Sequence, residues 1–181
     1  MELPSIYQLL LVLCLFFLPI SAEAGKNYDE NQLKAAISYK VAKFVTWPED
    51  AFNADGDPFV ICVFAEDDVV EGFDSLEGQT IEGRTIQLTT PQSGQACQEG
   101  HLFYFSERHI KKFDQILPEF KDRPVLTISD MKNFSSQEGM ITLINRGNKT
   151  RLIINLSSAF QARLKISSKL NVLATKVIRD K

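Results

Sequence analysis

The sequence predicts one α/β domain of three layers, in which a mostly parallel sheet ends in an antiparallel hairpin and carries helices on both faces. Two observations lead to this prediction. Short apolar strand patterns alternate with helical patterns along most of the chain, which is typical of a parallel sheet with crossover helices. After Asp130 the rhythm changes to two neighbouring strand patterns separated by turn residues, which indicates a hairpin.

The first helix is expected between Asp29 and Val45. Its apolar residues recur at the three-to-four spacing of one helical face: Leu33, Ala36, Ile37, Val41, Phe44 and Val45. Pro48 limits this helix, because the residue before a proline is pushed out of the α region.

A β-α-β unit follows the first helix. Residues 59–65 form a candidate buried strand, and residues 80–88 alternate like a strand, with a bulge or turn at Gly83. Between them, residues 67–76 are expected to form a short helix capped by Asp67 or Asp68. A connection of this length favours parallel pairing of the two strands.

The same alternation continues to the hairpin. We expect a strand at 101–105, an N-cap at Ser106, a helix at 107–117 that ends at Pro118, and a strand at 124–129. The hairpin strands are expected at 140–144 and 151–156.

The C-terminal part is expected to be helical. Ser157 or Ser158 caps a helix at 159–164, and Ser167 or Ser168 caps a last helix. One face of that last helix would carry the apolar residues Leu170, Leu173, Val177 and Ile178.

The N-terminus has the pattern of a cleaved export signal. Residues 9–18 form an apolar run that is too short to span a bilayer, and Ala22-Glu23-Ala24 reads as a cleavage site before Gly25. The segment before the run carries Glu2 and neither Lys nor Arg, which departs from the usual signal. We expect a signal peptide at 1–24 and a single mature domain at 25–181.

The mature chain is nearly neutral. Removing residues 1–24 takes away Glu2, Glu23 and no basic residue, so the net charge changes from −3 to −1. Such a chain has no electrostatic means of holding nucleic acid or an anionic membrane surface.

Two cysteines remain after signal cleavage. Cys14 is lost with the signal, and Cys62 and Cys97 stay. An even count in an exported protein predicts one disulfide between them. The alternative is two separate buried thiols, since Cys62 lies inside the apolar run 59–64.

The sequence offers little catalytic chemistry. It holds two histidines, His101 and His109, and a Ser-His-Asp arrangement of Ser106, His109 and Asp114 would lack the strained G-x-S-x-G turn that presents a nucleophile. Cys97 and His101 have metal-ligand spacing, but no second pair completes a four-ligand site. We therefore predict no catalytic residue, no metal and no cofactor.

An aromatic group is the remaining candidate for a site. Phe44, Trp47 and Phe52 cluster where the first helix stops. They form either part of the core or an aromatic surface for a protein partner or a small ligand.

Several segments together resemble the YfiR family of periplasmic proteins. The matching segments, in order, are YKVAKFVTWP at 39–48, FVICV at 59–63, LEG at 76–78, GR at 83–84, GHLFYFS at 100–106, PVLTISD at 124–130, GMI at 139–141, INL at 154–156 and LKISSKL at 164–170. The resemblance covers nearly all of the mature chain, and F-x-x-W-P with K-I-S-S-K-L are its most specific parts.

The resemblance implies a function that the residues alone do not give. It implies a periplasmic repressor that acts on an inner-membrane diguanylate cyclase through its periplasmic sensor domain, and so lowers cyclic di-GMP and biofilm formation. It also implies a homodimer, sequestration by an OmpA-like outer-membrane lipoprotein, and a disulfide at Cys62 and Cys97. A second disulfide of the family has no counterpart here. The alternative is a periplasmic small-ligand sensor or carrier without a cyclase partner.

Overall fold

The computed structural model describes residues 29–90, 97–120, 123–146 and 149–179. The expected signal peptide at 1–24 lies outside the described residues. Among the described residues, no helix is long and apolar enough to cross a membrane.

An eight-stranded mixed sheet forms the centre of the fold, in the order β10-β8-β7-β6-β5-β2-β4-β3. Its strands are β2 (Phe59–Phe64), β3 (Thr80–Ile81), β4 (Arg84–Thr89), β5 (Leu102–Phe105), β6 (Leu126–Ser129), β7 (Ile141–Arg146), β8 (Lys149–Asn155) and β10 (Ala174–Ile178). The strands from β4 to β7 pair in parallel, and β7 and β8 form the antiparallel hairpin. The predicted fold class is therefore confirmed.

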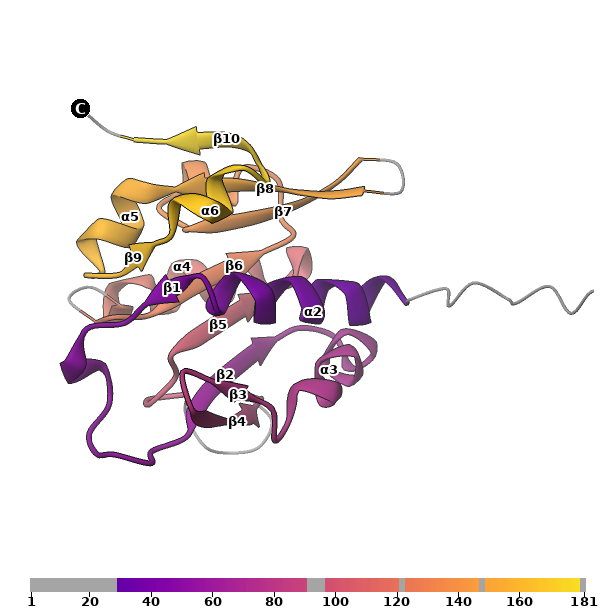
Figure 1. The fold of residues 1–181 in the computed structure, drawn as a ribbon. Helices are drawn as coiled ribbons and strands as arrows, with labels where there is room; N and C mark the ends of the chain where they lie inside the picture. The colour runs from indigo at the N-terminus through magenta and orange to yellow at the C-terminus, as the bar shows by residue number, and fades with distance from the viewer. Residues whose placement is uncertain (1–28, 91–96, 121–122, 147–148, 180–181) are drawn as a thin grey trace, which may run out of the picture.

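Helices cover both faces of this sheet (Figure 1). On one face lie α2 (Glu30–Ala42), α3 (Asp67–Phe73), α5 (Leu156–Gln161) and α6 (Ser168–Asn171), whose buried side chains share one apolar cluster with the sheet. On the other face α4 (Ile110–Phe120) packs against a second cluster rich in phenylalanine. The six residues of β2 are all buried between these layers, which explains its continuous apolar sequence.

A small antiparallel ribbon joins the end of α2 to the C-terminal part of the chain. It pairs β1 (Val45–Thr46) with β9 (Lys165–Ile166). The Ser167 amide also donates to the Phe44 carbonyl oxygen at 2.8 Å. The aromatic segment after α2 is thereby fixed against β9.

The predicted end of the helix at 107–117 is wrong. Pro118 lies inside α4, which continues to Phe120. A proline in a helix removes one backbone hydrogen bond and costs about 3 kcal/mol. Phe113 and Phe120 are both buried in the cluster under α4, and this burial on either side of Pro118 offsets the cost.

Two predicted helix caps are also wrong. The N-cap of α3 is Glu66, and Asp67 and Asp68 occupy the first turn, where their charges favour the positive end of the helix dipole. The N-cap of α5 is Asn155, whose Oδ1 accepts from the Ser158 amide at 3.0 Å.

The last predicted helix is mostly a strand. Ser167 caps α6 as expected, but α6 has only four residues. The chain then forms β10, which pairs in parallel with β8 and replaces the hairpin as the edge of the sheet. Thr175, Val177 and Ile178 are β-branched and suit a strand, and the backbone of β8 offers the hydrogen bonds.

Candidate binding site

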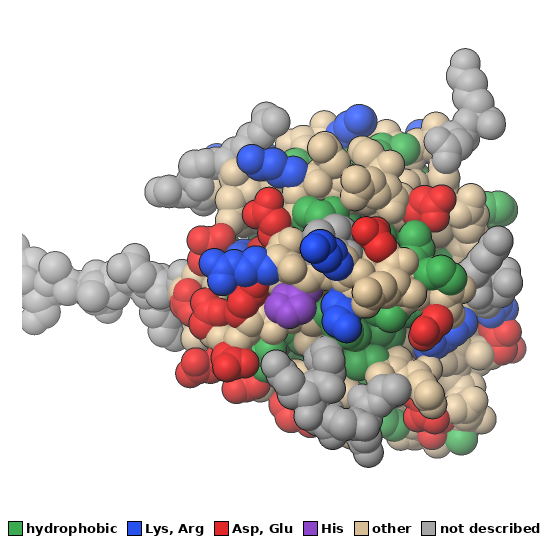
Figure 2. Space-filling model, turned by 180° about the vertical axis from the view of Figure 1, so that it is seen from behind, with side chains coloured by type: hydrophobic (Ala, Val, Ile, Leu, Met, Phe, Trp, Pro, Cys, Tyr) green, Lys and Arg blue, Asp and Glu red, His purple; other side chains and the backbone are tan. Residues whose placement is uncertain are grey.

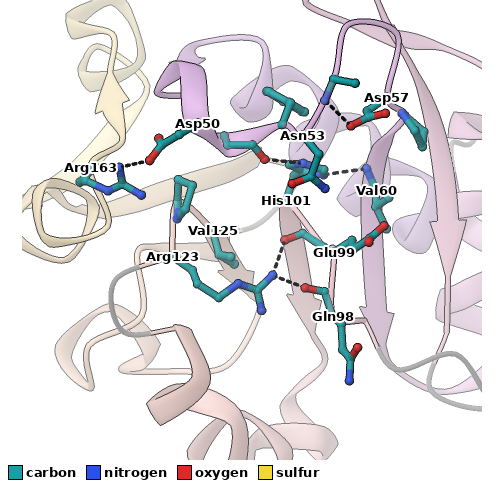
Figure 3. Close-up of a pocket in the computed structure, with 16 residues that line it drawn as sticks. Asp50, Asn53, Asp57, Val60, Gln98, Glu99, His101, Arg123, Val125 and Arg163 are labelled. Atoms are coloured by element: carbon teal, nitrogen blue, oxygen red, sulfur yellow. Dashed lines mark hydrogen bonds and ion pairs between the residues drawn. The ribbon is translucent and has the colours of Figure 1, made fainter.

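A pocket of about 570 Å³ opens at the amino ends of β2, β5 and β6 (Figure 3). One wall is the loop at 48–58, which connects β1 to β2. The other walls come from the residues just before β5 and β6 and from the turn after α5. This volume lies in the range of small-molecule pockets, roughly 300–1,000 Å³.

His101 connects the loop at 48–58 to the sheet. The Val60 amide donates to His101 Nδ1 at 3.1 Å, and His101 Nε2 lies 3.1 Å from the Ala51 carbonyl oxygen. Because a backbone amide can only donate, Nδ1 must be the acceptor and Nε2 must carry the proton. The imidazole is therefore neutral, with Nδ1 bonded to β2 and Nε2 bonded to the loop.

The environment of His101 favours the neutral ring. Burial lowers the pKa of His101 from 6.5 to about 4, and the Arg84 and Arg123 guanidinium groups act in the same direction. The Ala51 carbonyl and the Asp57 carboxylate raise this pKa, but by less. A group that stays neutral down to such a pH is a poor general base near neutrality.

Four rings pack in a row from the pocket wall into the core. They belong to Phe52, His101, Phe59 and Trp47, and we call them the aromatic stack. Phe52 stacks on His101 with centroids 4.4 Å apart, and His101 stacks on Phe59 at 5.3 Å. The Trp47 ring meets Phe59 edge-on at 5.0 Å. The stack couples the half-exposed Phe52 to the main core.

Arg84 covers the outer end of the aromatic stack. Its guanidinium carbon lies 3.9 Å from the centroid of the Phe52 ring, a cation–π contact. The same side chain donates to the carbonyl oxygens of Ala54 and Asp57, both at 3.0 Å. Arg84 thus holds the far end of the loop as His101 holds the near end.

The three aromatic residues singled out in the sequence lie in different environments. Trp47 is buried, at 6% exposure, and its indole N–H has no hydrogen-bond partner among the described residues. Phe44 is 36% exposed in the turn between α2 and β1. Phe52 is half-buried and lines the pocket. Only Phe52 therefore belongs to the pocket.

Charged side chains frame the pocket opening (Figure 3). Arg163 Nη1 lies 2.6 Å from Asp50 Oδ2, which ties the turn after α5 to the loop at 48–58. Arg123 Nη2 donates to the carbonyl oxygens of Gln98 at 2.5 Å and Gly100 at 3.4 Å. Burial lowers the pKa of Arg123. The pocket thus combines an aromatic wall with hydrogen-bonding groups at its rim, a usual combination in binding sites.

The disulfide lies directly behind this pocket. Cys62 of β2 is bonded to Cys97, with 6.0 Å between their Cα atoms, so the structure contains the expected pairing. The three residues after Cys97 line the pocket, and at the third, Gly100, an added Cβ would lie 2.8 Å from Cys62 Sγ. Glycine is needed at this position because the disulfide and the Phe103 ring fill the adjacent space.

The opposite end of the sheet holds the groups nearest to a catalytic arrangement. Ser106 Oγ lies 3.0 Å from His109 Nδ1, and Glu66 Oε1 lies 3.8 Å from the same nitrogen. A Ser-His-acid triad uses both ring nitrogens, one for the serine and one for the carboxylate. This group is therefore a polar cluster at a helix start and not a triad.

A second group of charged side chains lies at that end. Lys34 Nζ lies 2.9 Å from Asp130 and 3.3 Å from Glu30. Burial lowers the pKa of Lys34, but the two carboxylates raise it by more, so this amine stays charged. Tyr104 Oη is buried nearby, and burial, together with the Asp130 carboxylate beside it, raises its pKa. In the described ranges no group of His, Cys, Asp and Glu could hold a metal ion.

The side of the molecule on which α4 lies carries both acidic and basic side chains. Figure 2 shows basic and acidic side chains beside one another there, with apolar side chains between them. This distribution agrees with the low net charge, and on this face the basic side chains form no extended surface for an anionic polymer.

Comparison with protein families assigns the chain. A family model described as YfiR/HmsC-like matches residues 31–175. The chain belongs to the YfiR/HmsC-like family. A comparison with curated protein sequences finds no match. Membership implies a regulator of the YfiR type, and the matched range includes the whole pocket, both cysteines and the aromatic stack.

Sequence reasoning missed most of the pocket. The sequence indicates His101 only as a possible base or metal ligand. It does not indicate Arg84 or Arg123 as pocket residues, because isolated arginines are usually surface residues. The ion pair of Asp50 and Arg163 joins residues far apart in the chain. The family resemblance in the segments GR and GHLFYFS includes Arg84 and His101, but it implied no function for either residue.

Proposed function

We propose that this protein is a periplasmic repressor of an inner-membrane diguanylate cyclase, acting on the periplasmic sensor domain of that enzyme. The observation that carries the proposal is membership of the YfiR/HmsC-like family over residues 31–175. The expected export signal supports a periplasmic site of action. The chemistry of the described residues also supports a binding role, since its best Ser-His-acid group lacks triad geometry.

Repression of this kind requires differential affinity. To move a cyclase from mostly active to mostly inactive, the repressor must bind the inactive sensor conformation more tightly by roughly 5 kcal/mol. Energies of this size come from a few well-desolvated anchors and not from scattered surface charges. The pocket at the amino ends of β2, β5 and β6 provides such a place, and we propose Phe52 and this pocket as the contact for the sensor domain.

A genetic experiment tests the proposed function. Deleting the gene should raise cyclic di-GMP and surface attachment when the partner cyclase is present, and should change neither when the cyclase gene is also deleted. A rise that persists without the cyclase, or no rise with the cyclase expressed, would refute the repressor function.

Point variants test the proposed contact separately. Phe52→Ala should reproduce the deletion phenotype, whereas the control Phe160→Ala should not, because Phe160 is 83% exposed on α5 and does not line the pocket. Trp47→Ala is unsuitable here, since loss of a buried tryptophan destabilises a fold by about 3–5 kcal/mol. A stable Phe52→Ala protein that still represses would refute the contact and leave the function standing.

The pocket also favours a second function, that of a small-ligand sensor or carrier. Its volume of about 570 Å³ and its aromatic and guanidinium lining are suited to a small molecule. A ligand retained through purification and displaced by Phe52→Ala, together with unchanged cyclic di-GMP on deletion, would favour this function over repression.

A further inference from the structure

The charges of this chain are unevenly distributed along the sequence. Residues 31–48 and 151–179 hold nine basic residues and no acidic residue, whereas the rest of the mature chain holds 11 basic and 21 acidic residues. The mature net charge of −1 is therefore the sum of +9 in the first part and −10 in the second. The expectation that the chain cannot hold an anionic membrane surface rested on the net charge alone, and it does not apply to each face of the molecule.

The fold brings the two basic segments together. Strands β1 and β9 pair in antiparallel orientation, with Thr46 opposite Lys165, and both of these residues are exposed. The Ser167 amide donates to the Phe44 carbonyl oxygen at 2.8 Å and extends this contact. The end of α2 and the start of α6 therefore lie side by side on the same face of the sheet (Figure 1).

Large apolar side chains are exposed beside the lysines of these segments. Phe44 is 36% exposed in the turn after α2, and Val172 and Leu173 are 83% and 52% exposed after α6. Helix α6 itself turns Leu170 into the core and leaves Lys169 exposed. We call the following exposed residues the basic face: Lys43, Phe44, Lys165, Lys169, Val172 and Leu173.

The lysines of the basic face keep their charges. Among the described residues, no carboxylate forms an ion pair with Lys43, Lys165 or Lys169. Lys43 Nζ lies over the Tyr39 ring, 5.1 Å from its centroid, a contact that does not neutralise an amine. The three positive charges are thus available to an external anion.

The composition of the basic face is suited to a bilayer with anionic lipid. Segments that lie at a membrane interface combine lysines, which meet the headgroups, with Phe and Leu side chains, which enter the boundary of the acyl chains. A protein partner would instead need to enclose such apolar side chains in well-packed pockets. The apolar side chains here protrude, Val172 most of all, and a bilayer receives them without a matching cavity.

We propose that the basic face binds the surface of a bilayer that contains anionic phospholipid, with Phe44, Val172 and Leu173 at the level of the headgroups. Each lysine near such a surface strengthens binding about fivefold. In the proposed function this contact keeps the repressor at the membrane of its target enzyme, but the contact itself requires only lipid. Its test therefore uses vesicles without the cyclase, so the failure of either proposal leaves the other standing.

Cosedimentation of the purified mature protein with lipid vesicles tests the contact. Vesicles with about one third phosphatidylglycerol should bind the protein at least tenfold more tightly than vesicles of phosphatidylcholine. Raising the salt from about 50 mM to about 500 mM should remove most of this difference, because salt screens exposed charges.

A pair of double variants tests the position of the contact. Lys165→Glu with Lys169→Glu should weaken binding to the anionic vesicles at least tenfold. The control is Lys111→Glu with Lys112→Glu, the same change of net charge at two exposed lysines of α4, which lies on the opposite face of the sheet. This control should bind within threefold of the wild type. Circular dichroism checks that each variant keeps the fold.

An added tryptophan tests the apolar part of the contact. Val172→Trp places an indole on the basic face, and Lys112→Trp places one on α4, while Trp47 is buried in both proteins. Phospholipid with brominated acyl chains should quench the fluorescence added at 172 and leave the fluorescence added at 112 unchanged.

Four results would overturn the proposal. They are equal binding to anionic and neutral vesicles, unchanged binding of the Lys165→Glu/Lys169→Glu protein, equal quenching at 172 and 112, and no binding to vesicles at all. In the last case, loss of repression in cells by the same double variant would assign the face to an acidic protein partner. A change in the sedimentation mass of that variant without lipid would assign it to a second copy of the chain.

Discussion

His101 should make the stability of this protein fall in mild acid. The ring accepts from the Val60 amide and donates to the Ala51 carbonyl oxygen, and it is only 8% exposed. Protonation at Nδ1 would remove the acceptor for Val60 and place a cation beside Arg84 and Arg123. Burial, with a smaller effect of these two guanidinium groups, already lowers the pKa of this ring to about 4. The bond between the ring and β2 would then be lost, whereas the bond from Nε2 to the Ala51 carbonyl oxygen would remain.

The pKa values of His101 in the unfolded and folded states determine the direction and the size of this stability change. In the unfolded chain His101 titrates near 6.5 and in the folded protein near 4, so between these values the unfolded state binds more protons. The contribution of His101 to the free energy of unfolding is therefore largest above pH 6.5 and decreases as the pH falls toward 4. A difference of this size corresponds to about 3 kcal/mol over that range.

The assay is urea unfolding at a series of pH values from 4 to 7.5, followed by tryptophan fluorescence. The chain has one tryptophan, Trp47, which belongs to the aromatic stack and reports directly on it. The comparison variant is His101→Gln, whose amide can replace both hydrogen bonds without titrating in this range. The wild type should lose about 3 kcal/mol more than His101→Gln between pH 6.5 and 4. Parallel pH profiles of the two proteins would refute the reasoning.

Four other predictions concern the fold and its processing. Alkylation of the mature protein without reductant should find no free thiol, and two alkylated cysteines would contradict the disulfide. Cys62 and Cys97 are 35 residues apart, so reducing the bond between them should lower the free energy of unfolding by about 4 kcal/mol and the Tm by about 10 °C. Gly100→Ala should cost about 1–3 kcal/mol by overpacking against Phe103 and Cys62, and an unchanged urea midpoint would contradict this packing. Pro118→Ala should raise the unfolding free energy by about 2 kcal/mol, since it restores a backbone hydrogen bond within α4, and a lowered midpoint would contradict the position of Pro118. Amino-terminal sequencing of the exported protein should begin at Gly25, and a retained leader would refute the predicted cleavage.

The central strands were predictable because local pattern and tertiary environment agree. The apolar run of β2 is buried on both faces, and the alternating pattern with Gly83 became β3, a turn and β4. At Gly83 the backbone has φ +81, which glycine adopts without strain. The hairpin of β7 and β8 followed from turn residues between two strand patterns.

The errors lie where tertiary contacts decide between local alternatives. Pro118 normally ends a helix, yet the burial of Phe113 and Phe120 keeps α4 continuous. The residues of β10 fit a helical face as well as a strand, and the open edge of β8 decided the outcome. Sequence periodicity contains neither kind of information.

The candidate site could be predicted only in part. The sequence located the aromatic residues after the first helix, and Phe52 does line the pocket. It could not show that Trp47 would be buried or that His101 would stack on Phe52, because both depend on how the loop at 48–58 returns to the sheet. The sequence also did not show that Phe44 would stay partly exposed, because Phe44 lies in the turn between α2 and β1 and not on the helix as expected.

The most direct test of repression is the rate of cyclic di-GMP synthesis by the full-length partner cyclase in membrane vesicles, measured with increasing amounts of the purified mature protein. The protein must be added on the side of the membrane that exposes the sensor domain, and protein added only on the opposite side provides the control. The proposed function predicts that the rate falls with saturation and that Phe52→Ala shifts the curve to higher concentration. A rate that stays constant at saturating protein, with the sensor domain accessible, would contradict the claim that this protein represses the cyclase.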